Sequence, residues 1–246
     1  MSELTGKVAL VTGGSRGIGA AIAKRLAQDG ADVALTYVSA ADKARTIVAE
    51  IEAAGRRGLA IAADSVDPDA VTAAVERTAA EFGRFDILVN NAGIFPFGPP
   101  EAVTVEEIDR TLAIHVRAVF VASQSALRHM EAGGRIISIG SCLAQRVPHP
   151  GVSLYAMSKS ALIGFTKGLA RDVGARGITV NVVDPGSTDT DMNPADGPDA
   201  EAQRSFMAVG HYGSADDVAA MVAHLAGPGG RFVTGASIAV DGGYAA

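Results

Sequence analysis

Short runs of β-branched and other apolar residues alternate with longer alanine-rich stretches along the whole chain of 246 residues. The first run, Val8–Val11, is apolar at every position, which is typical of a strand covered on both faces of a parallel sheet. The stretch from Ile18 to Ala27 has apolar residues at helical spacing and is followed by Gly30, which ends the pattern. Because parallel strands need crossover connections, which are usually helices, this alternation predicts an α/β fold with a parallel sheet.

The same alternation continues to the end of the chain. Further strands are expected at 32–37, 58–62, 85–90, 135–140, 178–183 and 236–240, and further helices at 41–54, 67–82, 104–130, 153–174 and 215–226. We therefore predict one domain over residues 1–246, a doubly wound Rossmann fold whose seven-stranded parallel sheet is flanked by helices. Residues 186–213, rich in Asp, Gly and Pro, are expected to form a long functional loop, with or without a short helix, that supplies a substrate lid at about 187–212.

The charge balance narrows the classes of partner. With 21 basic against 27 acidic residues, the formal net charge is −6, which argues against general affinity for nucleic acid or an anionic membrane. The single cysteine, Cys142, cannot form an internal disulfide, and the five histidines show no metal-ligand spacing, so no metal site is expected. No segment reaches the roughly 20 uninterrupted apolar residues of a membrane span. We expect a cytoplasmic protein whose partners are small molecules and copies of itself.

A glycine-rich turn follows the first predicted strand and reads Thr12-Gly13-Gly14-Ser15-Arg16-Gly17-Ile18-Gly19. Glycines allow a tight turn and close approach to a pyrophosphate, and the amino end of the next helix offers free N–H groups and a positive dipole. A mere tight turn between strand and helix is the simpler alternative, but the position directly after the first strand favours a dinucleotide site. The candidate cofactor-binding residues here are Gly13, Ser15, Arg16, Gly17, Ile18 and Gly19.

The residues after the next two strands bear on which dinucleotide binds. The second strand ends without the acidic residue that would hold a ribose 2′-hydroxyl, whereas Arg16, Ser39 and Lys43 offer donors and positive charge suited to a 2′-phosphate. NADP(H) is therefore favoured over NAD, with solvated surface charges as the alternative interpretation of Arg16 and Lys43. Asp64 and Ser65, after the third strand, are candidates to bind the adenine amino group or to cap the following helix.

Five motifs in order resemble the classical short-chain dehydrogenase/reductases over essentially the whole chain. They are Thr-Gly-x-x-x-Gly-x-Gly at 12–19, Asn90-Asn91-Ala92-Gly93, Ser141, Tyr155-x-x-x-Lys159 and Pro185-Gly186-x-x-x-Thr190. The subgroup that the chain resembles most comprises the bacterial 3-oxoacyl carrier-protein reductases and related NADP-dependent ketoreductases. The resemblance implies that further cofactor contacts come from Asn91, Ala92, Gly93, Tyr155, Lys159, Pro185, Gly186, Thr188 and Thr190.

The chemistry of carbonyl reduction points to the same residues. Hydride addition to a carbonyl needs a proton donor for the developing alkoxide, and a phenol with the usual pKa of about 10 needs help to titrate near neutrality. Tyr155 and Lys159 are four residues apart on a predicted helix, hence on one face, so the ammonium could stabilise tyrosinate and reach the nicotinamide ribose. Ser141, at the end of the fifth strand, could hold the substrate oxygen. A surface Tyr/Lys pair and a serine that starts a turn are the plain alternatives.

The chain departs from the family pattern at two places. Where the family has an asparagine that helps to carry a proton-relay water, this chain has His115, which is expected either to hold that water with a ring nitrogen or to be a packing substitution that slows turnover. The spacing of fourteen from Ser141 to Tyr155 is one more than the commonest family value, which implies a longer loop through 146–150.

The expected substrate is a small uncharged ketone or aldehyde. Carrier-protein reductases of this family present basic residues after the fourth helix for an acidic partner, but here that segment reads Arg128-His129-Met130-Glu131-Ala132-Gly133-Gly134. The lid adds five carboxylates that would repel an acidic carrier, at Asp189, Asp191, Asp196, Asp199 and Glu201.

Two further expectations concern binding partners. The lid segment 189–198 is similar to that of a bacterial family member described as binding cyclic di-GMP, so a nucleotide-responsive regulator is the alternative function, with Arg146, Arg204 and His211 as its phosphate contacts. The helices predicted at 104–130 and 153–174 carry more apolar surface than one buried stripe requires, and the tail 239–244 resembles the family's C-terminal packing segment. We therefore expect a homo-oligomer, a tetramer.

Overall fold

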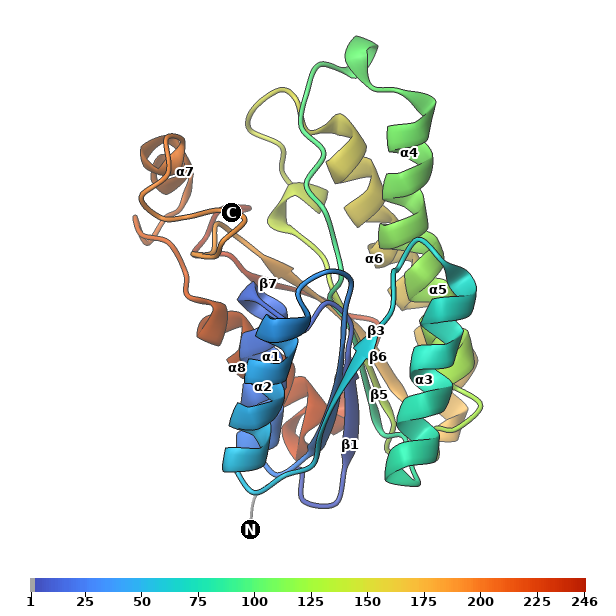
Figure 1. The fold of residues 1–246 in the computed structure, drawn as a ribbon. Helices are drawn as coiled ribbons and strands as arrows, with labels where there is room; N and C mark the ends of the chain where they lie inside the picture. Colours follow the sequence, from blue (N-terminus) through green and yellow to red (C-terminus); the bar gives the residue numbers. More distant parts are fainter. Residues whose placement is uncertain (1–2) are drawn as a thin grey trace.

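The computed structural model describes residues 3–246, in which a seven-stranded sheet has the order β3-β2-β1-β4-β5-β6-β7 (Figure 1). The strands, all parallel to their neighbours, are β1 Val8–Val11, β2 Asp32–Tyr37, β3 Gly58–Ala62, β4 Ile87–Asn90, β5 Arg135–Ile139, β6 Thr179–Pro185 and β7 Ser237–Val240. The order reverses between β1 and β4, which is where a doubly wound sheet opens a crevice at the carboxyl ends of its strands. The predicted fold class is confirmed.

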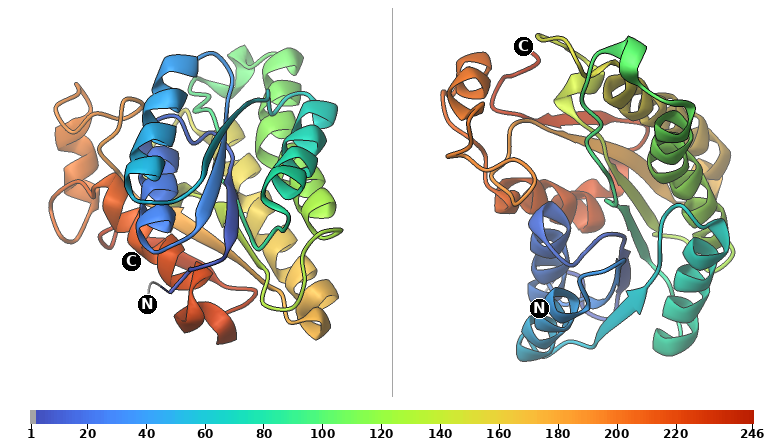
Figure 2. Two further views of the ribbon diagram at one scale, coloured as in Figure 1. Left: turned by 60° about the horizontal axis from the view of Figure 1, so that its bottom comes forward. Right: turned by 45° about the horizontal axis from the view of Figure 1, so that its top comes forward.

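Helices cover both faces of the sheet, as Figures 1 and 2 show. On one face lie α1 (Gly17–Gln28), α2 (Ala41–Ala53) and α8 (Ala215–Ala226), and on the other lie α3 (Pro68–Phe82), α5 (Ala118–Ala126) and α6 (Ser153–Val173). Strand β1 illustrates why its sequence is apolar throughout, because Ala9 and Val11 pack in the first layer and Leu10 in the second.

The predicted helix at 104–130 differs from the structure. It consists of α4 (Val105–Leu112), a π-helical turn (Ala113–Arg117) and α5, and it ends at Ala126. The wider π turn replaces the regular α-helical backbone bonds around His115, and the ring of this residue bonds groups outside the helix. In the loop 186–213, a short helix, α7, is present at Ala200–Phe206. The right-hand view of Figure 2 places α7 and the segment before α4 on opposite sides of the carboxyl ends of the strands.

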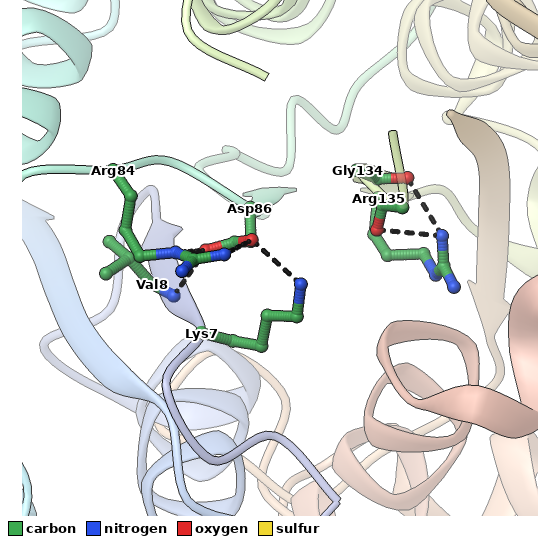
Figure 3. Close-up of polar contacts among 7 residues, drawn as sticks. Lys7, Val8, Arg84, Asp86, Gly134 and Arg135 are labelled. Carbon is green, nitrogen blue, oxygen red and sulfur yellow. Dashed lines mark hydrogen bonds and ion pairs between the residues drawn. The ribbon is translucent and has the colours of Figure 1, made fainter. Parts of the chain in front are cut away.

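A charged cluster ties β1 and β4 together at the amino end of the sheet (Figure 3). The buried Asp86 carboxylate accepts hydrogen bonds from the Val8 N–H at 3.0 Å, from Lys7 Nζ at 3.0 Å and from two nitrogens of Arg84 at 2.7 Å. Burial alone would raise the pKa of Asp86, but these donors outweigh it and hold the pKa below its usual value. Among the helices of residues 3–246, none combines the length and apolar composition that a bilayer crossing requires.

Candidate active site

The glycine-rich turn after β1 and the turn after β4 are locked together. Asn91 Nδ2 donates to the carbonyls of Thr12 at 2.9 Å and Gly13 at 3.0 Å, while Thr12 Oγ1 accepts the N–H groups of Asn91 and Ala92. A Cβ at Gly13, whose φ is +65°, would lie 2.9 Å from Ala92 Cα, and a Cβ at Gly19 would lie 2.4 Å from Asn91 Nδ2. Glycine is therefore required at both positions for this contact.

The amino end of α1 fits a pyrophosphate. Gly17 begins the helix and Arg16 precedes it in extended conformation, and no side chain in the described chain caps this end. The first N–H groups of α1 and its positive dipole are thus available beside buried Ser15 and partly exposed Ile18. Gly17 also faces the lid, since a Cβ there would lie 3.5 Å from Thr190 Cγ2.

The residues expected to hold a 2′-phosphate are exposed near the end of β2. Arg16 and Ser39 are open to solvent, whereas Lys43 Nζ donates to Asp191 Oδ2 of the lid at 2.8 Å. Hydrogen bonding and charge from Lys43 lower the pKa of Asp191, and Arg16 contributes in the same direction. A 2′-phosphate bound at this place would compete with Asp191 for the Lys43 ammonium.

Asp64 does not cap α3, so one of its two sequence interpretations is wrong. The Asp64 carboxylate accepts the Val66 N–H at 3.0 Å and closes a turn, while Asp67 caps the helix by accepting the N–H groups of Asp69 and Ala70. Asp67 is the cap rather than Asp64 because it stands directly before Pro68, the first residue of the helix. Ser65 lines a small cavity with Asn90 and other residues at the carboxyl end of β4.

Ser141 follows β5 and is fixed by a carboxylate that the sequence analysis missed. Its N–H donates to Asp184 Oδ1 at 3.0 Å, and its Oγ accepts the Leu143 N–H at 3.2 Å. Asp184, on β6, is fully buried and also accepts hydrogen bonds from Gln145 and Ser237. No local pattern reveals this role, because Asp184 lies 43 residues from Ser141 in the chain.

Tyr155 and Lys159 lie on the first turns of α6, beside Ser141. Lys159 is buried, its Nζ donates to the Ile139 carbonyl at 2.8 Å, and it stands 5.8 Å from the centre of the Tyr155 ring. Burial lowers the pKa of Lys159 to about 8, and the Asp184 carboxylate limits the fall. Burial raises the pKa of Tyr155 to about 12, although hydrogen bonding with Ser141 opposes that rise.

These pKa values differ from the expectation that Lys159 would lower the pKa of Tyr155. The physical reason is that the ammonium bonds a backbone carbonyl at the end of β5, while burial dominates the phenol. At neutral pH, the Tyr155 phenol keeps its proton and Lys159 is charged. The site therefore holds a protonated donor next to a cation.

His115 is 1% exposed and bonds protein groups through both ring nitrogens. Nε2 lies 3.0 Å from the Ile94 N–H, and Nδ1 lies 2.8 Å from Ser158 Oγ, which itself donates to the Tyr155 carbonyl at 2.7 Å. Burial, followed by the charge of Lys159, lowers the pKa of His115 to about 3. These hydrogen bonds occupy both ring nitrogens, one of which we expected to hold a relay water. A role of His115 in the proton relay stays a prediction.

The segment after β6 leads from the sheet into the lid. Pro185 ends the strand, Gly186 N–H donates to the Val240 carbonyl at 3.0 Å, and Thr188 Oγ1 donates to the Gly186 carbonyl at 3.1 Å. A Cβ at Gly186 would lie 2.6 Å from Asp241 Cα, so the chain passes close to the C-terminal tail. Thr190 pairs with Asn193 at the start of the lid.

Apolar and aromatic side chains surround the Tyr155 phenol. A cluster joins the longer loop after β5, the lid and the tail, and comprises Cys142, Leu143, Val152, Tyr155, Phe206, Met207, Tyr212 and Tyr244. Phe95, after β4, packs edge-on to Tyr155 with ring centres 4.8 Å apart, and His149 stacks on Phe206. Burial raises the pKa of the Cys142 thiol to about 12, so it stays protonated and acts as a small apolar group.

Known proteins share this arrangement of sequence and fold. A sequence model of the family described as enoyl-(acyl carrier protein) reductase matches residues 13–245. The chain is 48% identical over 246 residues to a cyclic-di-GMP-binding biofilm dispersal mediator protein of Escherichia coli (strain K12), with 100% of both chains covered. A solved short chain dehydrogenase from Burkholderia cenocepacia J2315 in complex with NADP is 65% identical with a TM-score of 0.98, covering 99% of this chain and 100% of that one.

A blue fluorescent protein from a metagenomic library, solved in complex with NADPH, is 61% identical with a TM-score of 0.98, again covering 99% of this chain and 100% of that one. Matches over essentially the whole length agree with the five motifs and with the sheet order. The chain therefore belongs to the short-chain dehydrogenase/reductase family.

Proposed function

We propose that this protein is an NADP(H)-dependent ketoreductase that reduces the carbonyl group of a small uncharged ketone or aldehyde. The observation that carries the proposal is that Ser141, which follows β5, lies next to Tyr155 and Lys159 on the first turns of α6. When bound, the nicotinamide supplies the hydride. The relatives solved with NADP and NADPH support this cofactor.

The chain's own residues orient the substrate and supply its proton. Ser141 Oγ donates to the substrate oxygen, held in place by the Asp184 carboxylate behind its backbone. The Tyr155 phenol, protonated at neutral pH, transfers its proton to the developing alkoxide. The Lys159 ammonium stabilises the tyrosinate that results and binds the nicotinamide ribose.

The surroundings of the site favour an uncharged, apolar substrate. The lid carboxylates are exposed to solvent, which disfavours an acidic carrier. After α5, the Glu76 carboxylate lies 2.8 Å from His129 Nε2 and 4.0 Å from Arg128 Nη1, so a negative charge stands beside the basic residues there. The aromatic cluster around Tyr155 offers apolar contacts to the rest of the substrate.

A screen of NADPH consumption over small ketones, diketones, aldehydes, acyl thioesters and sugars tests this proposal, with wild type beside Tyr155→Phe. We expect kcat for one or more uncharged carbonyl compounds to fall about 10²–10⁴-fold in the variant, because the acid at the carbonyl is removed. NADPH binding should persist in both proteins. If no compound separates the two proteins, the reductase proposal is wrong.

The Escherichia coli relative supports a second candidate function, a regulator that binds a cyclic dinucleotide. All three side chains expected to contact its phosphates have internal partners: Arg146 donates to the Tyr244 carbonyl at 2.6 Å, and Arg204 pairs with Glu201 at 3.1 Å. The third, His211, is exposed and its Nδ1 lies 2.9 Å from the Tyr212 carbonyl. Saturable binding of cyclic di-GMP by calorimetry, without turnover of any carbonyl compound, would favour the regulator.

We also propose that the protein is a homotetramer. Large apolar side chains are exposed on α4, α5 and α6, at Val105, Phe120 and Met157, and the Phe232 side chain before β7 is 98% exposed. Association of subunits would bury these side chains and remove their apolar area from water. Light scattering at micromolar concentration should give four times the chain mass, and a monomeric mass would contradict the proposal.

A further inference from the structure

His115 connects two segments that flank the Tyr155 phenol. On one side its Nε2 binds the N–H of Ile94, which lies between the turn after β4 and Phe95. On the other side its Nδ1 bonds Ser158 Oγ, and the Ser158 hydroxyl donates a hydrogen bond to the Tyr155 carbonyl. The ring also packs edge-on to the Tyr155 ring, with centres 5.8 Å apart.

The hydrogen-bond network fixes the form of the ring. Nε2 accepts a hydrogen bond from a backbone N–H, so it carries no proton. The Ser158 hydroxyl uses its one proton to donate to the Tyr155 carbonyl, so it accepts a hydrogen bond from Nδ1–H. The imidazole is therefore neutral, with its proton on Nδ1. A pKa of about 3, caused chiefly by burial, agrees with this form.

The first turn of α6 needs such support. Val152 occupies the N-cap position, and within residues 3–246 no side chain caps this end of the helix. Gly151 precedes it with a φ of +89°. A first turn without a side-chain cap frays more easily than a capped one, yet this turn carries Tyr155.

We propose that His115 is a positioning residue, which as a neutral imidazole fixes the first turn of α6, and with it the Tyr155 phenol, relative to the loop after β4. The proposal rests on the reductase function for its kinetic consequences. It differs from a relay role because no proton passes through the ring. A ring that is fully buried and bonded at both nitrogens suits a fixed support better than a proton carrier.

Three variants separate these roles. Ser158→Ala removes the hydrogen bonds that link His115 to Tyr155 and keeps the one from the Ile94 N–H, whereas His115→Phe removes both links. We expect kcat to fall about 10-fold in either variant, because small displacements of a reacting group cost up to 10²-fold. KM for NADPH should stay constant in Ser158→Ala and rise in His115→Phe. The double variant should be no slower than His115→Phe, because both changes cut one chain of contacts.

A matched control is Thr166→Val, on the same helix, where the buried hydroxyl has no hydrogen-bond partner among the residues described. It should leave kcat and KM unchanged. A kcat in Ser158→Ala equal to wild type, or additive losses in the double variant, would overturn the proposal. If His115→Phe fails to fold, the Ser158→Ala result still decides it.

Amide hydrogen exchange tests the positioning role of His115 without any substrate. By mass spectrometry, Ser158→Ala should speed amide exchange in 153–158 alone, and His115→Phe should speed it in 153–158 and 91–97. Unchanged exchange in both segments would refute the positioning role. If exchange changes as expected while wild type and Tyr155→Phe consume NADPH alike, the reductase proposal fails and the positioning role of His115 stands.

Discussion

Replacing Asp184 by asparagine tests the electrostatics of the site. The fully buried carboxylate accepts the Ser141 N–H, Gln145 Nε2 and Ser237 Oγ. Asparagine can keep the first bond through its remaining carbonyl oxygen, but its NH₂ group then faces the Gln145 NH₂ group, and the Ser237 hydroxyl has to rotate to accept from it. The loss of two charge-assisted bonds, offset by the smaller cost of burying an amide, gives a destabilisation of about 1–3 kcal/mol.

The same change should move a pKa. Burial lowers the pKa of Lys159 to about 8, and Asp184 acts against that fall. Without the carboxylate, the Lys159 pKa drops further, so the ammonium is lost at a lower pH and kcat/KM for carbonyl reduction declines earlier on the alkaline side.

Urea denaturation measures the stability of Asp184→Asn, and a pH profile of kcat/KM measures the shift of the alkaline limb. Asp172→Asn, an exposed change on α6, is the control and should alter neither. A variant with the stability and the alkaline limb of wild type would show that Asp184 supports neither Ser141 nor the charge on Lys159, and the reasoning would be refuted.

Three further changes test the cofactor end and the base of the sheet. Arg16→Ala should weaken NADPH binding by about 1–3 kcal/mol and spare NADH, measured by fluorescence titration, and equal losses for both would contradict a 2′-phosphate contact. Asp191→Asn frees Lys43 and should tighten NADPH binding about 2- to 5-fold, whereas Asp196→Asn, elsewhere on the lid, should not. Asp86→Ala should cost about 1–3 kcal/mol in urea at pH 7, because the buried Val8 N–H loses its acceptor while the two cationic partners can turn to solvent. That carboxyl has a lowered folded pKa, so its contribution should vanish as pH falls through that pKa, and a difference that persists in acid would contradict the assignment.

The sequence predicted the sheet closely because each strand is a local apolar run. The first three strands match residue for residue, whereas β6 begins one residue later than expected, at Thr179, and extends two residues further, to Pro185. The helix at 104–130 is interrupted by the π turn Ala113–Arg117, in which the His115 ring bonds Ile94 and α6. Helical periodicity carries no information about such partners.

The candidate site was predictable in part for the same reason. Residues that belong to short motifs, such as the glycine-rich turn and the Tyr155/Lys159 pair, can be recognised from their spacing in the sequence. Asp184 and Ser158 do not, because each partner lies 43 residues away in the chain. Their roles depend on which strand and helix lie side by side, which only the folded chain reveals.

The two central pKa values shift in opposite directions, and this bears on how the site works. Burial moves Tyr155 up to about 12 and Lys159 down to about 8, so on raising the pH the lysine loses its proton before the phenol does. The alkaline limb of carbonyl reduction should therefore report Lys159, and it should lie near pH 8. An alkaline limb near pH 12 would instead assign it to the phenol. The order matters because a charged lysine beside a protonated phenol is the arrangement that donates a proton to an alkoxide and then stabilises the tyrosinate left behind.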